Sequence, residues 1–179
     1  MKIDDALNTI TEQDFIFILK NGKRSSKING HDFESLINFS LRFVKETLPN
    51  LLKSGKFGKI IIEAFKDVGI GMFDCDVDRI NNNEILYFIL WLKDQLELWN
   101  LNELNYLSSE PNIELSGAGI NELDKFGVMN VVDALAGGDI TKHELIWKMK
   151  YGNVFDKQWK SVIESKIQKK LSKVKPKLK

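Results

Sequence analysis

The residues best suited to chemistry lie in an acidic stretch, residues 74–78, which reads Asp-Cys-Asp-Val-Asp. Alternating aspartates place oxygens as the first half of a calcium-binding loop does. The sixth position of such a loop needs glycine but is Arg79 here, and the twelfth needs a carboxylate but is Ile85. The pattern therefore favours a solvated acidic loop before the positive end of a helix, with a cation at residues 74–84 as the less favoured alternative.

Other reactive residues stand alone in the sequence. Cys75 is the single cysteine, and its aspartate neighbours raise the pKa of a thiol, which opposes nucleophilic use. His31 and His143 have no second histidine or cysteine at metal-ligand spacing. Residues 54–59, Ser-Gly-Lys-Phe-Gly-Lys, lack the spacing of a phosphate-binding loop. We therefore expect no catalytic residues, no cofactor and no metal, and a protein that is not an enzyme.

The composition is that of an ordinary globular domain. The 179 residues include 26 Lys and Arg against 25 Asp and Glu, and 43% are hydrophobic. A chain of this length can bury a core without metals or disulfides. The N-terminus carries Asp4 and Asp5 where a secretory signal has cations, and the longest apolar run, residues 85–92, is too short to cross a membrane. We therefore expect no association with a membrane.

The three prolines divide the chain at about residues 50 and 111, which predicts an N-terminal helical region over 1–110 and a C-terminal helical lobe over 111–179. The apolar spacing predicts a helix from Asp32 to Leu48 that Pro49 ends, and a looser one over 51–68 with a short strand at 60–62 as the alternative. Residues 12–19 fit a helix or a strand, because Asn21-Gly22 is a hairpin signal. The strongest prediction is a long helix over 84–107.

The C-terminal region predicts four more helices. Two short ones are expected near 120–126 and 130–136, and Thr141 and Glu144 have the spacing of a capping box that opens a third. A last helix carries apolar residues from Val154 to Leu171. Together these patterns predict an all-α fold, an irregular bundle of six to eight helices around the long central helix, with a smaller C-terminal helical lobe.

Two features of the C-terminal region could recognise a partner. The first is an aromatic ridge of four residues at intervals of four, Trp147, Tyr151, Phe155 and Trp159. Packing in the core is the favoured explanation for this ridge, and contact with a partner groove is the alternative. From residue 166 to 179 there are 7 lysines and no carboxylate, which fits a solvated helix end, docking on an acidic protein, or contact with nucleic acid. The candidate partner-binding residues are Trp147, Tyr151, Phe155, Trp159, Lys166, Lys169, Lys170 and Lys173.

Four stretches carry a resemblance to a known class of proteins. They begin at Tyr106 (YLSSEPN), Ala118 (AGINELDKFG), Asp133 (DALAGGDITKHE) and Met149 (MKYGNVF). Over roughly the last 70 residues the chain resembles the tail-assembly chaperones of tailed bacteriophages of low-GC hosts. The resemblance implies non-enzymatic work on partner proteins during virion assembly.

The resemblance also sets expectations for partners and location. The partners would be other phage structural proteins or a second copy of the chain, with nucleic acid as a less favoured partner. The place would be the host cytoplasm, or the virion for a structural protein. A virion structural role, as a head–tail connector, capsid or tail component, is the first alternative to a chaperone. A small nucleic-acid-contacting protein that uses the C-terminal lysines is the second.

Overall fold

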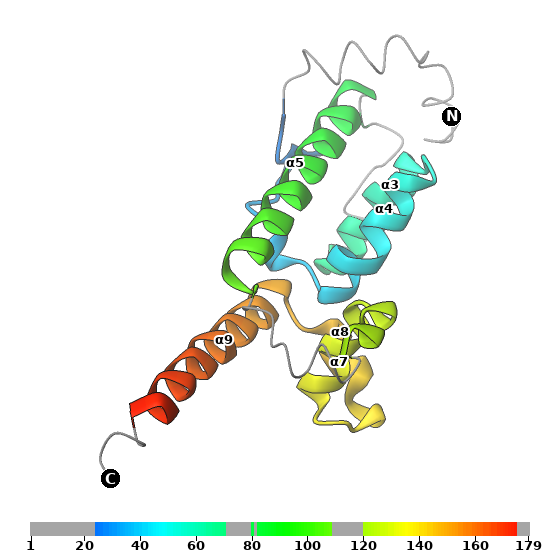
Figure 1. Ribbon diagram of the computed structural model, residues 1–179. Coiled ribbons are helices and arrows are strands. Elements are labelled where there is room, and N and C mark those ends of the chain that lie inside the picture. The colour runs from blue at the N-terminus through cyan, green and yellow to red at the C-terminus, as the bar shows by residue number, and fades with distance from the viewer. Residues whose placement is uncertain (1–23, 71–79, 81, 109–119, 175–179) are drawn as a thin grey trace.

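The computed structural model describes residues 24–70, 80, 82–108 and 120–174, and it confirms the predicted all-α fold (Figure 1). Expectations for residues 12–22 and for the acidic stretch at residues 74–78 fall outside the described residues, as does the division near residue 111. The first elements are β1 (Lys27–Ile28), β2 (His31–Asp32), η1 (Leu36–Asn38), η2 (Phe43–Thr47), α3 (Leu48–Lys53), α4 (Phe57–Asp67) and α5 (Asn82–Tyr106). They are followed by η4 (Ile120–Phe126), α7 (Val128–Ala136), η5 (Ile140–Lys142), α8 (His143–Lys148) and α9 (Tyr151–Val174).

The helix predicted to start at Asp32 was placed too early. Asn29 and Gly30 both have positive φ and turn the chain into a two-residue antiparallel hairpin, so Asp32 belongs to β2. Its carboxylate accepts a hydrogen bond from the Ser26 hydroxyl at 2.6 Å. The hairpin buries Ile28 completely, and apart from the short 3-10 helix η1, continuous helical backbone begins only at residue 41. Local turn chemistry therefore overrides the apolar spacing in this segment.

Pro49 does not end a helix, contrary to the prediction. Helical backbone runs from residue 41 to residue 53, and Pro49 lies in the first turn of α3. The preceding turn is a π-helix, in which the Leu48 amide donates to the Phe43 carbonyl five residues back. In an α-helix the proline ring collides with the carbonyl four residues earlier. The wider π turn relieves this conflict, and the first turn of α3 tolerates a missing amide donor.

Residues 51–68 form two helices rather than one. Ser54, Gly55 and Lys56 separate α3 from α4, and Gly55 has a φ of 68°, which favours glycine. The strand alternative at 60–62 is not adopted, because this stretch lies inside α4. There Ile60, Ile61, Ala64 and Phe65 are buried on one face.

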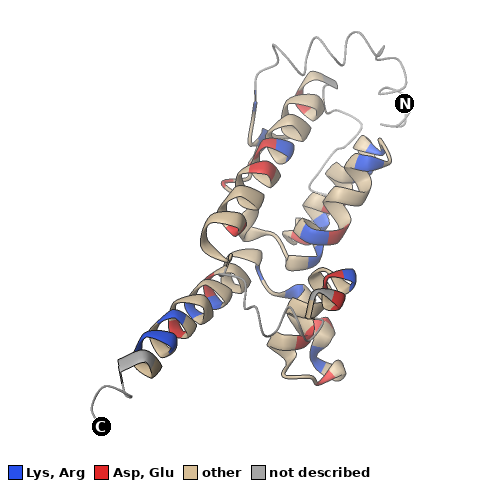
Figure 2. Cartoon of the chain, viewed as in Figure 1, with Lys and Arg blue, Asp and Glu red and all other residues tan. Residues whose placement is uncertain are grey.

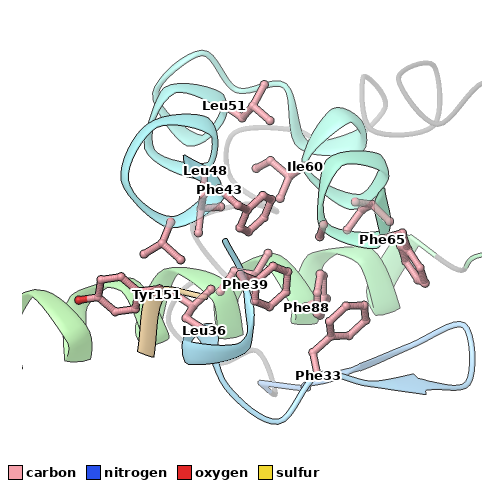
Figure 3. Packing of buried hydrophobic residues seen from close by; sticks show 14 of the residues in the cluster. Phe33, Leu36, Phe39, Phe43, Leu48, Leu51, Ile60, Phe65, Phe88 and Tyr151 are labelled. Atoms are coloured by element: carbon pink, nitrogen blue, oxygen red, sulfur yellow. The ribbon is translucent and has the colours of Figure 1, made fainter. Parts of the chain in front are cut away.

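The main core lies between α5 and the α3–α4 layer. The predicted long helix is confirmed as α5, which has 25 residues and contacts α4, η1 and β1 (Figure 1). Phe33 is central to this core, because its ring lies 5.0 Å from that of Phe88 and 5.3 Å from that of Phe65. Figure 3 shows these side chains converging with Phe39, Phe43, Leu36, Leu48, Leu51, Ile60 and Tyr151.

The C-terminal lobe contains the two short helices that were predicted, now seen as η4 and α7, and Gly137 ends α7 with a φ of 67°. The capping box predicted at Thr141 and Glu144 is not formed. Asp139 provides the cap instead, accepting hydrogen bonds from the amide and hydroxyl of Thr141. The Glu144 carboxylate is paired with Arg42, far away in the sequence, and so does not cap its own helix.

The last helix, α9, is the predicted C-terminal helix and has 24 residues. Its first turn lies in the core, and the rest extends away from the body of the protein (Figure 1). Close packing at the first turn requires a small residue. A Cβ atom at Gly152 would lie 3.0 Å from Ile37 Cβ and 3.3 Å from the Ile37 carbonyl oxygen.

We predict that Gly152→Ala lowers the free energy of unfolding by about 1–3 kcal/mol, because the added methyl group overpacks the contact with Ile37. Urea unfolding followed by circular dichroism measures the change. Ser161→Ala, on the exposed part of α9, is the matched control and should stay within about 0.5 kcal/mol of the wild type. A Gly152→Ala variant as stable as the control would contradict this packing.

Candidate functional site

The position of α9 is set by backbone pairing with the segment before η2. Ser40 and Lys150 form an antiparallel bridge, in which the Leu41 amide donates to Met149 O and the Tyr151 amide donates to Phe39 O, both at 2.8 Å. The Ser40 amide and hydroxyl also donate to the Asp67 carboxylate at the end of α4. The start of α9 is therefore fixed to the core by main-chain hydrogen bonds.

A polar cluster lies beside this bridge. The Tyr151 hydroxyl donates to Glu103 Oε1 at 2.8 Å, and the Lys45 ammonium donates to the other Glu103 oxygen. The same ammonium lies 5.4 Å from the centre of the Tyr151 ring. Burial, together with the negative charge of Glu103, raises the pKa of Tyr151 well above its ordinary value of 10.0. Each group in the cluster has a partner within it, which is typical of a structural network rather than a reactive site.

A second ion pair holds α8. Arg42 donates to both oxygens of Glu144, at 3.1 and 2.8 Å, and its guanidinium lies 5.3 Å from the centre of the Trp147 ring. The hydrogen bonds from Arg42 keep the pKa of Glu144 below its usual range. Bidentate pairs of this kind are geometrically specific, so this one orients α8 against η2.

The four residues of the aromatic ridge have two different environments. Trp147, Tyr151 and Phe155 are buried, and the Phe155 ring lies edge-on to Trp99 of α5 at 5.2 Å. Trp159 packs against Tyr106 at 5.2 Å but keeps 40% of its surface exposed. The first three side chains therefore face the interior of this chain, and Trp159 is the ridge residue that a partner can reach.

Beyond this point α9 presents apolar side chains to solvent. Ile163, Ile167 and Leu171 are 44%, 49% and 50% exposed and continue the four-residue spacing from Trp159. We call residues 159–172 distal α9. Lys166, Lys169 and Lys170 are exposed on it, and Lys173 belongs to the same helix. Figure 2 shows the colour of Lys and Arg recurring along α9. Apolar surface left uncovered along a helix is typical of a binding face.

A groove of about 620 Å³ lies between the end of α5, the start of α7 and the first half of α9. Its wall is mostly apolar, with Lys45 and Glu103 at one side. The residues that line it are Leu41, Lys45, Asn100, Glu103, Leu104, Leu107, Ser108, Gly127, Val128, Val131 and Gln158.

The described residues contain no group of three or more His, Cys, Asp or Glu side chains that could hold a metal ion. His143 pairs with Asp133 at 3.1 Å, and His31 lies edge-on to the Phe65 ring. In the described ranges, no helix is both long enough and apolar enough to cross a membrane. In the stretch 54–59, which was compared with a phosphate-binding loop, Ser54, Gly55 and Lys56 connect α3 and α4, and the remaining three residues belong to α4.

Sequence reasoning missed the pairs that hold α8 and α9 in place. Lys45 and Glu103 are 58 residues apart, and Arg42 and Glu144 are 102 residues apart. Each residue by itself looks like an ordinary exposed charge on a helix. The one available signal was Tyr151, because a tyrosine buried at a helix start needs a partner for its hydroxyl group.

Comparison of the chain with protein-family models, with curated proteins and with solved structures finds no match.

We predict that Tyr151→Phe lowers the free energy of unfolding by about 1–2 kcal/mol at pH 8, since it removes the hydrogen bond to Glu103. The pKa of Tyr151 is raised in the folded state, so above pH 10 the unfolded wild type ionises while the folded protein does not, and stability falls. The variant lacks this loss, so the difference in the free energy of unfolding between the wild type and the variant becomes smaller as the pH rises above 10. Urea unfolding at pH 8 and pH 11 measures both effects.

The matched control is Tyr106→Phe, because the Tyr106 side chain is about half exposed. We expect it to change stability by less than about 0.5 kcal/mol at pH 8. A gap between Tyr151→Phe and the wild type that stays constant from pH 8 to pH 11 would contradict the environment described for the Tyr151 hydroxyl.

Proposed function

We propose that the protein is a non-enzymatic protein–protein interaction module in tailed-phage particle assembly, a chaperone-like factor for tail proteins. The supporting observation is that α9 begins in the core and extends outward, with apolar side chains exposed on distal α9. Amphipathic helices of this kind bind other proteins through apolar residues spaced three or four apart. The assignment to phage assembly rests on the resemblance of the last 70 residues, and a virion structural role is its alternative.

The types of side chain on distal α9 favour a protein partner over nucleic acid. Because an α-helix has about 3.6 residues per turn, Lys166 and Lys170 lie on the same side of α9 as Trp159 and Ile163. A phosphate backbone needs clustered cations but gains nothing from aliphatic side chains between them. A protein partner with acidic and apolar groups satisfies both sets of residues.

The test is co-purification of the tagged full-length protein from infected cells. We expect tail proteins to be recovered with it, and the double substitution Ile167→Ser and Leu171→Ser to reduce that recovery at least tenfold, because it removes two exposed anchors. The control substitution is Ser161→Ala together with Ser165→Ala, on the opposite side of α9. Recovery with enzymes of small-molecule metabolism only, and never with tail or head proteins, would overturn the proposal.

Mass spectrometry of purified virions separates the two roles in assembly. A chaperone-like factor is expected to be absent from mature particles although it is abundant in infected cells. A protein present in fixed stoichiometry in the particle would instead be a structural component.

A further inference from the structure

Distal α9 is poorly suited to stand alone in water. Its four largest apolar side chains, Trp159, Ile163, Ile167 and Leu171, keep about half of their surface exposed. A helix that is not packed against other elements is marginally stable, since most helical stability in proteins comes from burying an apolar face. This helix therefore gains stability from a partner that covers the side on which these residues lie.

The charges of distal α9 restrict what that partner can be. Between residues 160 and 172 the helix has Lys160, Lys166, Lys169 and Lys170 but a single carboxylate, Glu164. The opposite side, with Ser161, Ser165, Gln168 and Ser172, carries Lys169 as its one charged residue. Pairing distal α9 with the same helix of a second copy would place lysines against lysines, which is unfavourable. The covering surface must therefore be acidic and apolar.

The chain itself has such a surface in its C-terminal lobe. We call residues 120–144 the acidic lobe, because they carry five carboxylates against two lysines, and four carboxylates still exceed the lysines when Glu144, which pairs with Arg42, is set aside. The lobe also exposes large apolar side chains, which are Ile120, Leu123, Phe126, Met129 and Ile140. It borders the 620 Å³ groove through Gly127, Val128 and Val131. Charge and apolar character therefore match those of distal α9.

The two surfaces do not meet within one molecule. Figure 1 shows α9 extending away from α7 and α8, and the bridge at Ser40 and Lys150 fixes that direction at its start. The apolar side chains of both surfaces stay exposed, as Ile167 on α9 and Phe126 on the lobe show. Two copies related by a twofold axis can bring each distal α9 onto the acidic lobe of the other.

We propose that the protein forms a reciprocal homodimer in which distal α9 of each copy docks on the acidic lobe of its partner. This inference rests on the proposed function, because a second copy covers the same side of the helix that a tail protein would bind, so that the two partners compete for it. The contact forms twice in a twofold dimer, so each anchor contributes twice. Because the two surfaces have opposite charge, the dimer should weaken as salt increases.

The experiment is sedimentation velocity of the full-length protein over a range of concentrations in low and high salt. We expect a concentration-dependent dimer whose dissociation constant rises at least tenfold between 50 mM and 500 mM salt. Two double variants test the surfaces. Lys166→Glu with Lys170→Glu reverses the charge of distal α9. Glu122→Lys with Asp124→Lys reverses the charge of the acidic lobe. Each should be monomeric alone while its circular dichroism remains that of the wild type.

Mixing the two double variants is the decisive step. An acidic α9 then meets a basic lobe at one contact, and a wild-type pair meets at the other, so we expect a heterodimer of near wild-type affinity. The control, Lys53→Glu with Lys59→Glu on α3 and α4, should dimerise like the wild type. A wild-type protein that stays monomeric at all concentrations overturns the inference, as does a dimer that neither reversal weakens. A monomer that still recovers tail proteins leaves the proposed function standing, so the two failures are distinguishable.

Discussion

The antiparallel bridge between Ser40 and Lys150 is the contact on which the arrangement of this protein depends. It joins two segments that are 110 residues apart in numbering, and two 2.8 Å main-chain hydrogen bonds flank it. Together with the close packing of Gly152 on Ile37, it sets the start of α9 against the core. With it, Tyr151 is held in the interior, and its hydroxyl reaches Glu103 on the long helix α5. The direction of α9 and the exposure of its distal residues follow from that attachment.

Two ion pairs add to the bridge in fixing α8 and the start of α9. Lys45 and Arg42 are neighbours in one helical stretch, yet the first pairs with α5 and the second with α8. Each cation also lies over an aromatic ring, Tyr151 or Trp147, which adds a favourable contact to the ion pair. The N-terminal part of the chain therefore holds both α8 and the start of α9. These contacts help to hold Trp147 and Tyr151 in the interior, so that neither residue faces a partner.

The sequence was informative wherever structure is local. The 25-residue helix α5 and the short helices of the lobe were predicted, because the periodicity of their apolar residues decides them. The errors arose where one local signal competed with another. The segment near Asp32 favoured a helix by spacing but formed a hairpin, and Pro49 did not stop a helix because a π turn preceded it. Glu144 pairs with Arg42 instead of forming the predicted capping box, and no local pattern in the sequence indicates this long-range pair.

The candidate site was predictable in composition but not in position. The lysines and aromatic residues of the last two helices stood out at once, but which of them face solvent depends on the bridge and on Glu103, both long-range features. Because Trp147, Tyr151 and Phe155 are buried, the surface that a partner can reach lies on distal α9, where lysines and aliphatic side chains share one side. A surface of that kind suits an acidic, apolar partner, and the chain's own lobe has that character.

Amide hydrogen exchange on dilute protein tests the central claim most directly. The account predicts that the amides of Leu41 and Tyr151, which donate across the bridge, exchange only on global unfolding, because their protection requires the folded core. It predicts that the amides of residues 160–172 exchange at least a hundredfold faster, since this part of α9 lacks a covering partner. Equal protection along the whole of α9, or rapid exchange at Leu41 and Tyr151, would contradict it.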